Sequence, residues 1–592
     1  MKARLQALLS HRWLPPVAIL LGTLLLIGGV DAGFLGDDHI HTAMLKRDPA
    51  MPWGTVSPWD LYLLVPGDPT TKNNFKELGV APWWAVDDFQ IAFVRPLSSL
   101  LLYAERRLWP QNTARMMHVM SLVWLAVFLT AGVWVIRRFL GTAVAAGMAI
   151  LLFCLDDAHL FPAFWIANRN GLVAATFALF SFLLHDSWRR HGRRAAGVAA
   201  PVLLLLGLLG AEFGLSILGF FIAYALFLDP DKPKRAFKYL IPYLIVIIAW
   251  RTAYSLMGYG VSGSDAYLDP LQRPAMFTVN ALTRLPIALM GLFGVPHIEF
   301  NVPLPPEIKI YYVAVAYAWV GWVAYVLRPF FKQSAVARFL GVSAVLALVP
   351  TVAADASDRL LIIASVGGMG LLGMLIASYF PASSVTRPKG RLYSTAAAGL
   401  VVMTLFLNLV VAPISTPVWL SVVSKFMRIP QNGAQSIPNS EDMPSKTVVI
   451  VAAHDMFASF LVPVWRSALD LSVPKQTLVL TNTVDPLRVT RKDATSLELT
   501  IEAGHFNTWT HGLVRRADTP MPPGHKVTYP GMTLDVITAT DDGNPVTVIA
   551  TFDRPLDDPD YIWLTWGSGG YVPFSLPAVG EAKTLDIDEY NL

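Results

Sequence analysis

The chain has 592 residues, of which 54% are hydrophobic and only 15% are charged. Soluble domains average about 25% charged residues, so this composition excludes an ordinary soluble protein and predicts a membrane protein. The net charge of +4 does not indicate nucleic-acid binding, because the basic residues are concentrated in short loops. The single cysteine, Cys154, excludes an intramolecular disulfide.

The first hydrophobic segment follows a basic N-terminus that contains Lys2, Arg4 and Arg12. It resembles a signal sequence, but no small-residue cleavage motif follows it, so we expect an uncleaved first helix. A spanning helix needs roughly 20 mostly apolar residues, and on this basis the sequence predicts about eleven spans. They lie near 14–33, 116–136, 141–157, 166–186, 196–210, 213–228, 237–256, 310–328, 336–354, 359–379 and 392–413.

The connections between these segments divide by charge. Alternate connections are basic, and all of them fall on the side of the basic N-terminus. These basic clusters are Arg137-Arg138, Arg189–Arg194, Lys232–Arg235, Arg328–Arg338 and Arg387–Arg391. The opposite connections carry acidic residues, among them Asp37-Asp38 and Asp156-Asp157. The positive-inside rule therefore predicts a cytoplasmic N-terminus and a C-terminus outside.

Two further apolar segments, 87–108 and 277–295, are interrupted by charges or proline and predict interfacial or re-entrant helices. The first of them lies in a long external loop, 34–115. After Pro413 the composition changes, and short β-branched runs alternate with turn signals. The runs are 447–452, 476–481, 497–501, 533–538, 546–552 and 561–566. We therefore expect a polytopic α-helical domain, 1–430, followed by a β-rich extracytoplasmic domain, 431–592.

Charged and histidine side chains recur at the predicted outer face. Asp37 and Asp38 open the first external loop, and Arg95 lies in a Phe-Val-Arg-Pro-Leu stretch of that loop. Asp156, Asp157 and His159 follow the third span, and Trp165-Ile166 precedes Arg169 at the fourth. Glu212 and Asp358-Arg359 occupy later outer connections. Charged residues at the mouth of a membrane helix bundle cost free energy unless they have a function there.

The order of these motifs resembles the GT-C superfamily of integral membrane glycosyltransferases, most closely the polyprenyl-phosphate-sugar-dependent branch that includes protein O-mannosyltransferases. In that family an aspartate motif opens the first external loop, a Phe-Arg-Pro-Leu stretch follows, and Trp-Ile-x-x-Arg begins the fourth span. The resemblance covers about residues 14–413. The chain departs from it where Asp156-Asp157 replace histidine-proline, where Phe161 replaces glutamate, and where Ala211 precedes Glu212 in place of lysine.

The resemblance implies transfer of a sugar from a polyprenyl-phosphate donor to an external acceptor, which could be a protein, a lipid or a glycan. Asp38, or its neighbour Asp37, would act as the base that takes the acceptor's proton. The arginines Arg95, Arg169 and Arg359 would bind the donor phosphate, because a guanidinium binds oxyanions through two parallel hydrogen bonds. Attack opposite the leaving phosphate would invert the anomeric centre.

Each of these candidate site residues could instead have a purely structural role. The pair Asp37-Asp38 and the isolated Glu212 could cap helices. Arg169 could extend its charged end to the membrane interface. Arg359 could serve only to form an ion pair with Asp358 at the start of a helix. The second-loop residues Asp156, Asp157 and His159 could bind the acceptor, hold a metal, or merely form an interfacial loop. No cofactor is firmly implied, and a divalent metal is an open alternative.

A transporter or flippase of lipid-linked sugars is the alternative function. Transporters usually show internal repeats and charges at mid-membrane depth, whereas here the charged residues are predicted at the outer face. The expected location is a bacterial inner membrane, with the N-terminus in the cytoplasm and the β-rich domain outside. The expected partners are the bilayer, the lipid-linked donor and the external acceptor, with no nucleic acid.

Overall fold

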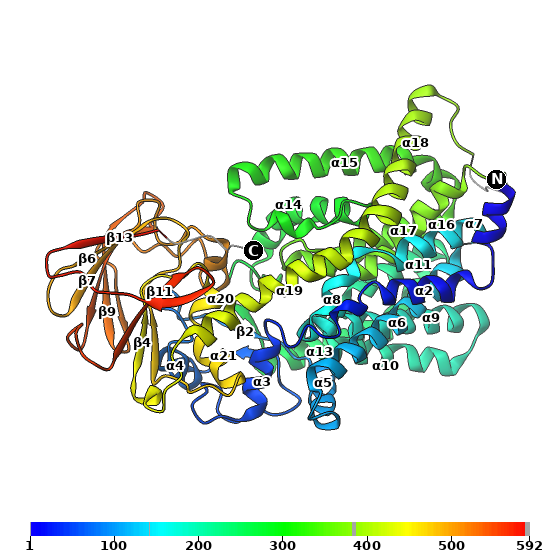
Figure 1. The fold of residues 1–592 in the computed structure, drawn as a ribbon. Coiled ribbons are helices and arrows are strands. Elements are labelled where there is room, and N and C mark those ends of the chain that lie inside the picture. The colour runs from blue at the N-terminus through cyan, green and yellow to red at the C-terminus, as the bar shows by residue number, and fades with distance from the viewer. Residues whose placement is uncertain (1, 141–142, 382–385, 587–592) are drawn as a thin grey trace. The chain divides into compact units, whose positions relative to one another are not determined.

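The computed structural model describes residues 2–140, 143–381 and 386–586, and these form two compact units (Figure 1). The first unit contains Met1–Gly33, Val94–Met257 and Asp269–Ser421. The second contains Phe34–Phe93, Gly258–Leu268 and the chain from Val422 onward. Most of the predicted first external loop therefore belongs to the same compact unit as the β-rich region.

The first unit is helical. Its helices, with α19 shared between the units, are α1 (Lys2–Leu9), α2 (Leu14–Leu24), α5 (Pro96–Leu108), α6 (Thr113–Phe139), α7 (Ala143–Cys154), α8 (Leu160–Phe164), α9 (Asn170–His191), α10 (Arg194–Gly210), α11 (Leu218–Phe227), α12 (Pro233–Ala236), α13 (Ile241–Leu256), α14 (Pro274–Leu292), α15 (Pro306–Gln333), α16 (Ala335–Leu348), α17 (Ile362–Ala377), α18 (Arg391–Phe406) and α19 (Ala412–Ser436).

The chain is a polytopic α-helical membrane protein. Among the described residues, seven helices are long and apolar enough to cross a membrane, and two bent helix pairs raise that number to nine. Shorter apolar helices occupy Arg194–Gly210, Glu212–Phe227 and Ile362–Ala377. Each predicted span coincides with one of these helices or bent pairs, although positions 141–142 of the third span lie outside the described residues.

Helix α14 also meets the length and hydropathy of a membrane span, whereas the sequence predicted an interfacial or re-entrant helix there. That prediction depended on Arg284 and Pro286, which interrupt the apolar segment. In the structure the guanidinium of Arg284 pairs with Asp355 at 2.8 Å and donates to the carbonyl of Val352 at 2.9 Å. The neighbouring loop therefore neutralises the charge that argued against a span.

Small residues let the apolar helices approach closely. A Cβ atom added to Gly219 of α11 would lie 2.6 Å from the backbone nitrogen of Ala347 in α16. One added to Gly373 of α17 would lie 2.5 Å from the carbonyl oxygen of Ala145 in α7. Such contacts are typical of membrane helix bundles, where van der Waals packing replaces the hydrophobic effect as the driving force.

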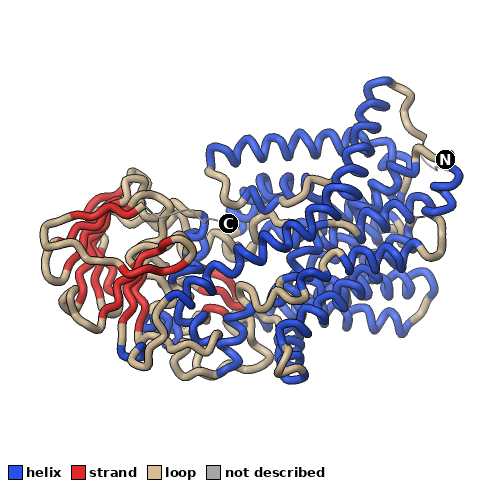
Figure 2. Tube along the Cα trace, viewed as in Figure 1, coloured by secondary structure: helices blue, strands red, loops and turns tan. Residues whose placement is uncertain are grey.

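The second unit holds the strands, which Figure 2 shows in red. A three-stranded sheet has the order β1 (Leu63–Val65), β2 (Gln90–Ala92), β3 (Gly260–Ser262). An antiparallel six-stranded sheet has the order β13 (Ala582–Leu585), β6 (Leu487–Arg491), β7 (Ser496–Thr500), β10 (Pro545–Phe552), β9 (Met532–Ala539), β8 (Lys526–Tyr529). A four-stranded sheet has the order β12 (Gly570–Pro573), β11 (Tyr561–Gly567), β4 (Thr447–Ile450), β5 (Gln476–Val479). The helices of this unit are α3 (Asp38–Lys46), α4 (Pro69–Leu78), α20 (Met456–Ser459) and α21 (Val462–Ala468).

The β-rich region is confirmed, because all six predicted β runs coincide with strands of the two larger sheets. The interfacial helix predicted over 87–108 is only partly correct. Its first part contains strand β2, and helix α5 begins at Pro96. Proline favours the first turn of a helix and disfavours continuation from the residue before it, so the boundary falls there.

Candidate functional site

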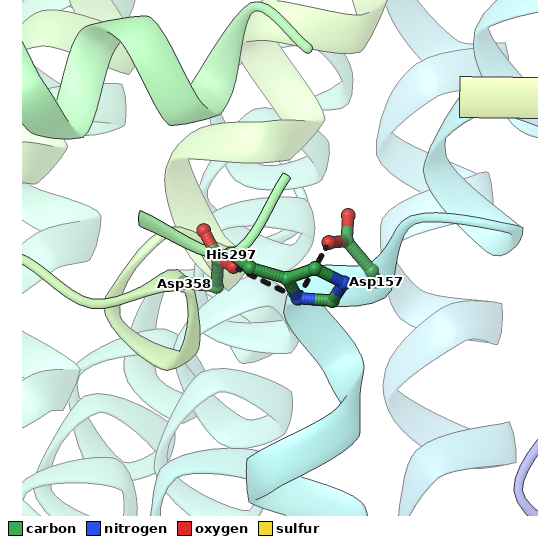
Figure 3. Close-up of side chains that lie close together, drawn as sticks. All are labelled: Asp157, His297 and Asp358. Atoms are coloured by element: carbon green, nitrogen blue, oxygen red, sulfur yellow. Dashed lines mark ion pairs between the residues drawn. The ribbon is translucent and has the colours of Figure 1, made fainter. Parts of the chain in front are cut away.

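Two aspartate side chains and one histidine side chain meet in the first unit (Figure 3). Asp157 follows α7, His297 follows α14, and Asp358 precedes α17. The Nδ1 atom of His297 lies 3.5 Å from an Oδ2 atom of Asp157 and 4.0 Å from Oδ2 of Asp358. Three connections that are far apart in the sequence thus bring their side chains to one place, which we name the acid–histidine cluster.

Hydrogen bonds fix the loops that carry this cluster. The Oε1 atom of Glu299 accepts from the hydroxyl of Ser357 and from the backbone N–H of Asp358, both at 2.8 Å. The side chain of Asn301 donates to the carbonyl of Ala356 at 2.9 Å. The loop after α14 and the loop before α17 are therefore joined, and the backbone at Asp358 is held in place.

His297 has an unusual backbone conformation. Its φ of 57° and ψ of 52° place it in the left-handed region, which non-glycine residues adopt rarely and which costs of the order of 1–3 kcal/mol. Its Nε2 atom lies 3.4 Å from the hydroxyl of Ser415, and its ring centroid lies 5.0 Å from that of Trp419. The backbone strain brings the imidazole between the two carboxylates, and such strain is concentrated at functional sites.

The electrostatics of the cluster favour a bound cation. Burial and the neighbouring Glu299 raise the pKa of Asp358 well above its usual value. Burial lowers the pKa of His297, although the charge of Asp157 opposes that effect. The Oδ2 atom of Asp157 and the Oε2 atom of Glu299 are buried and accept no hydrogen bond. Buried carboxylate oxygens normally have a hydrogen-bond donor, a counter-charge or a metal ion.

The donor set of the cluster fits a divalent metal ion. One ligand atom each from Asp157, His297 and Asp358 lies within 4.8 Å of the others. Carboxylate oxygens combined with one imidazole nitrogen suit ions such as Mn²⁺ or Zn²⁺. The Asp157 Oδ2 atom, which faces His297 but accepts no hydrogen bond, supports the same interpretation. Among the described residues these three form the only group found with such an arrangement.

The other predicted residues of the second outer loop have different surroundings. The side chain of Asp156 accepts from the backbone N–H of Ala158 at 3.1 Å and so caps the short helix Asp157–His159. The ring of His159 contacts Phe128 and Phe153, and its Nε2 atom lies 2.7 Å from the carbonyl oxygen of Phe153. His159 supplies no ligand atom to the acid–histidine cluster.

The three predicted phosphate-binding arginines differ in how much of their charge is already paired. Arg169 is 2% exposed, and its guanidinium pairs with Glu105 at 2.5 Å and donates to the carbonyl of Met117 at 2.8 Å. Arg95 pairs with Glu212 at 2.9 Å. Both guanidinium charges are therefore already paired with a glutamate.

Arg359 is half-buried, and its guanidinium carbon lies 5.8 Å from the ring centroid of Trp165. No carboxylate lies within ion-pair distance of it in the described parts of the chain. It directly follows Asp358 of the acid–histidine cluster. Of the three predicted arginines, Arg359 is therefore the one best able to bind an additional anion.

The adjacent acids of the first loop lie in the second unit and differ from each other. Asp38 begins α3, is 1% exposed, and its Oδ2 atom accepts from the backbone N–H of Leu35 at 2.9 Å. Asp37 precedes the helix and is half-buried. The two adjacent acids therefore have different environments.

Sequence reasoning did not identify His297 or Glu299 as site residues, and it treated Asp358 only as a partner of Arg359. The one available signal was His297-Ile298-Glu299, two polar side chains in a predicted outer connection. A single such pair is not specific, because the cluster exists only when three distant loops converge.

No protein-family model matches the chain, and no curated protein matches it. Solved structures similar to it include an oligosaccharyltransferase of Archaeoglobus fulgidus tethered with an acceptor peptide (12% identity, TM-score 0.39, covering 80% of this chain and 64% of that one). They also include the archaeal oligosaccharyltransferase AglB from Archaeoglobus fulgidus in complex with an inhibitory peptide and a dolichol-phosphate (12%, TM-score 0.41, 78% and 64%). A third is ArnT from Cupriavidus metallidurans bound to undecaprenyl phosphate (11%, TM-score 0.36, 78% and 89%).

The chain matches less than two thirds of the length of the two oligosaccharyltransferases. Because every TM-score lies below 0.5, the activity of this chain has to be argued from its own side chains.

Proposed function

We propose that the chain is a membrane glycosyltransferase that moves a sugar from a polyprenyl-phosphate donor to an acceptor outside the cytoplasm. The observation that carries the proposal is that Arg359, whose charge is not paired with an acid in the described parts of the chain, directly follows Asp358 of the acid–histidine cluster in the sequence. A buried group of acids next to an available guanidinium, at the ends of apolar helices, suits a phosphate that a membrane lipid presents.

Arg359 would bind the donor phosphate. A guanidinium donates two parallel hydrogen bonds to a phosphate and retains its charge at every physiological pH. As the bond between the sugar and the phosphate breaks, negative charge accumulates on the phosphate, and a fixed cation stabilises that charge most in a buried site. The contact with Trp165 restricts the side chain before the donor binds.

Asp38 is the proposed base, with Asp37 as the alternative. Its carboxylate would take the proton of the acceptor, a contribution of about 10²–10⁴-fold for general-base catalysis. The acceptor oxygen would then attack the anomeric carbon opposite the leaving phosphate. The transition state has oxocarbenium character, and the anomeric configuration is inverted.

A divalent cation is compatible with this proposal. Asp157, His297 and Asp358 would hold it, because their ligand atoms converge and Asp157 has an unsatisfied oxygen. When bound, such an ion supplies positive charge that can stabilise phosphate oxygens. Glu299 fixes the loop of Asp358 through two hydrogen bonds and so keeps the ligand set together.

The remaining elements of the proposal concern setting and partners. We propose that the N-terminus lies in the cytoplasm of a bacterial cell, that the membrane is the inner membrane, and that the β-rich domain lies outside. This orientation follows from the one-sided arginine and lysine clusters and the positive-inside rule. The acceptor would be an envelope protein, lipid or glycan that meets the donor on the outer side.

Donor binding tests the role of Arg359. Removing one charge-assisted contact costs about 1.5–3 kcal/mol, so Arg359→Ala should raise the Kd for a fluorescent polyprenyl phosphate by about 10–100-fold in nanodiscs. Arg107→Ala is the matched control, because Arg107 also lies over an aromatic ring, 5.3 Å from the centroid of Tyr103, but on the exposed end of α5. Equal binding by wild type and Arg359→Ala would contradict the proposed phosphate site.

A further inference from the structure

We propose that helix α21 of the β-rich region positions the acid pair Asp37-Asp38 by holding helix α3 at both ends. Both helices belong to the second unit. The proposal rests on the proposed function in so far as this pair supplies the base. It assigns to the β-rich region a part in the chemistry, although the region contributes no reacting atom.

The first contact is made at the beginning of α3, next to the acid pair. His39 follows Asp38, is 4% exposed, and its ring centroid lies 4.6 Å from that of Trp465 in an edge-to-face arrangement. The Nε2 atom of His39 lies 3.1 Å from the carbonyl oxygen of Phe34. Trp465 is 2% exposed, and its Nε1–H donates to the carbonyl of Phe457 at 3.2 Å. Both rings are therefore fixed by packing and by hydrogen bonds.

The second contact is made at the other end of α3. The ammonium group of Lys46 donates to the carbonyls of Ser467 and Ala468 at 3.0 and 2.9 Å, and pairs with Asp470 at 2.7 Å. These carbonyls lie at the C-terminal end of α21, where helix carbonyls lack intrahelical partners and the dipole favours a cation. The hydroxyl of Ser467 also donates to Asp48 at 2.8 Å, just beyond α3.

Helix α21 is itself held rigidly. Its residue Arg466 is fully buried and directs its guanidinium only to neutral oxygens. The acceptors are the carbonyls of Ala434, Ile437, Pro438 and Ser472 and the side-chain oxygen of Asn439. A movement of α21 would leave a buried charge without these acceptors, which is strongly unfavourable.

The two contacts therefore determine where α3 presents its first turn. Asp38 lies in that turn, and the backbone N–H of Leu35 orients its carboxylate. Displacement of a catalytic group by about 1 Å can lower a rate by about 10²-fold. Trp465 and Lys46 are positioning residues in this scheme, because they act on the acid pair only through α3.

Lys46→Met is the informative variant, because Lys46 is 31% exposed and its removal leaves the core intact. Amide hydrogen exchange over Asp38–Lys46 should become about tenfold faster, since the end of the helix loses its anchor. The kcat for sugar transfer should fall by about tenfold, while the Kd for polyprenyl phosphate should stay within about twofold. Lys46→Arg, which retains the hydrogen-bond donors, should restore the wild-type exchange rate of α3 and the wild-type kcat.

The matched control is Lys76→Met. Lys76 pairs with Asp87 at 2.9 Å, is 35% exposed, and lies in the same unit on α4. It should change neither the exchange of α3 nor the transfer rate. Unchanged exchange of α3 in Lys46→Met would overturn the proposal, and so would faster exchange with an unchanged kcat.

The experiments also distinguish a failure of this proposal from a failure of the assignment of the base. If Asp37→Asn and Asp38→Asn both transferred sugar at the wild-type rate, the proposed base would be wrong. Faster exchange of α3 in Lys46→Met would in that case still establish that α21 anchors the helix.

Discussion

At the scale of single residues, the structure distinguishes side chains that look equivalent in the sequence. Three arginines were predicted to bind phosphate, yet two of them are paired with glutamates and only Arg359 is not. The adjacent acids Asp37 and Asp38 also differ, because Asp38 is buried and has a backbone donor. The remaining hydrogen-bonding capacity of each group, and not its residue type, indicates which of them can act on a substrate.

The identity of the base follows from a comparison of two isosteric variants. Asp38→Asn keeps the shape of the side chain but removes the proton acceptor, so transfer should fall by about two to four orders of magnitude. Asp37→Asn should lose much less, and both should still bind polyprenyl phosphate. A larger loss in Asp37→Asn would assign the base to Asp37, and wild-type rates in both would exclude the pair.

At the scale of elements, the sequence predicted most of what depends on local pattern. The apolar segments became helices because their hydrophobic length is encoded within each segment, and the six β runs became strands for the same reason. Strands β6, β8 and β13 were not predicted, since they contain several polar residues.

Contacts between elements could not be predicted in the same way. No periodicity indicates that Glu105 of α5 meets Arg169, or that His297 lies between Asp157 and Asp358. These contacts depend on how whole helices pack and on where loops from distant parts of the sequence meet. The particular residues that converge therefore required the structure.

The buried pair of Glu105 and Arg169 gives a prediction about element packing. Removing one partner of a buried ion pair leaves an uncompensated charge and costs about 3–5 kcal/mol. Arg169→Met should therefore lower the thermal unfolding temperature in detergent. The double variant Glu105→Met with Arg169→Met should regain most of that loss, because apolar replacement of a buried pair is often neutral.

The pair of Arg95 and Glu212 is the control for this prediction, since its side chains are 18% and 25% exposed, against 2% and 5% for Arg169 and Glu105. Arg95→Met should have a smaller effect on unfolding. If Arg169→Met kept the wild-type unfolding temperature but lost binding of polyprenyl phosphate, Arg169 would belong to the donor site and its structural assignment would be wrong.

At the scale of the whole molecule, the chain divides into a polytopic helical unit and a β-rich unit that includes most of the loop predicted over 34–115. The helical unit carries the acid–histidine cluster and Arg359, and the other unit carries the acid pair. Deletion of the β-rich region should therefore abolish transfer, because α3 loses its anchor on α21.

The most direct test of the central claim is a reconstitution that follows the bond between sugar and lipid. Purified protein would be placed in vesicles with a synthetic polyprenyl-phosphate sugar labelled on the sugar, together with an envelope extract from a strain that lacks this chain. The account predicts that the label leaves the lipid fraction, joins an acceptor in the extract and releases polyprenyl phosphate, and that Asp38→Asn prevents this. Label that crosses the bilayer while still attached to its lipid, with no release of polyprenyl phosphate, would contradict the account and identify a flippase.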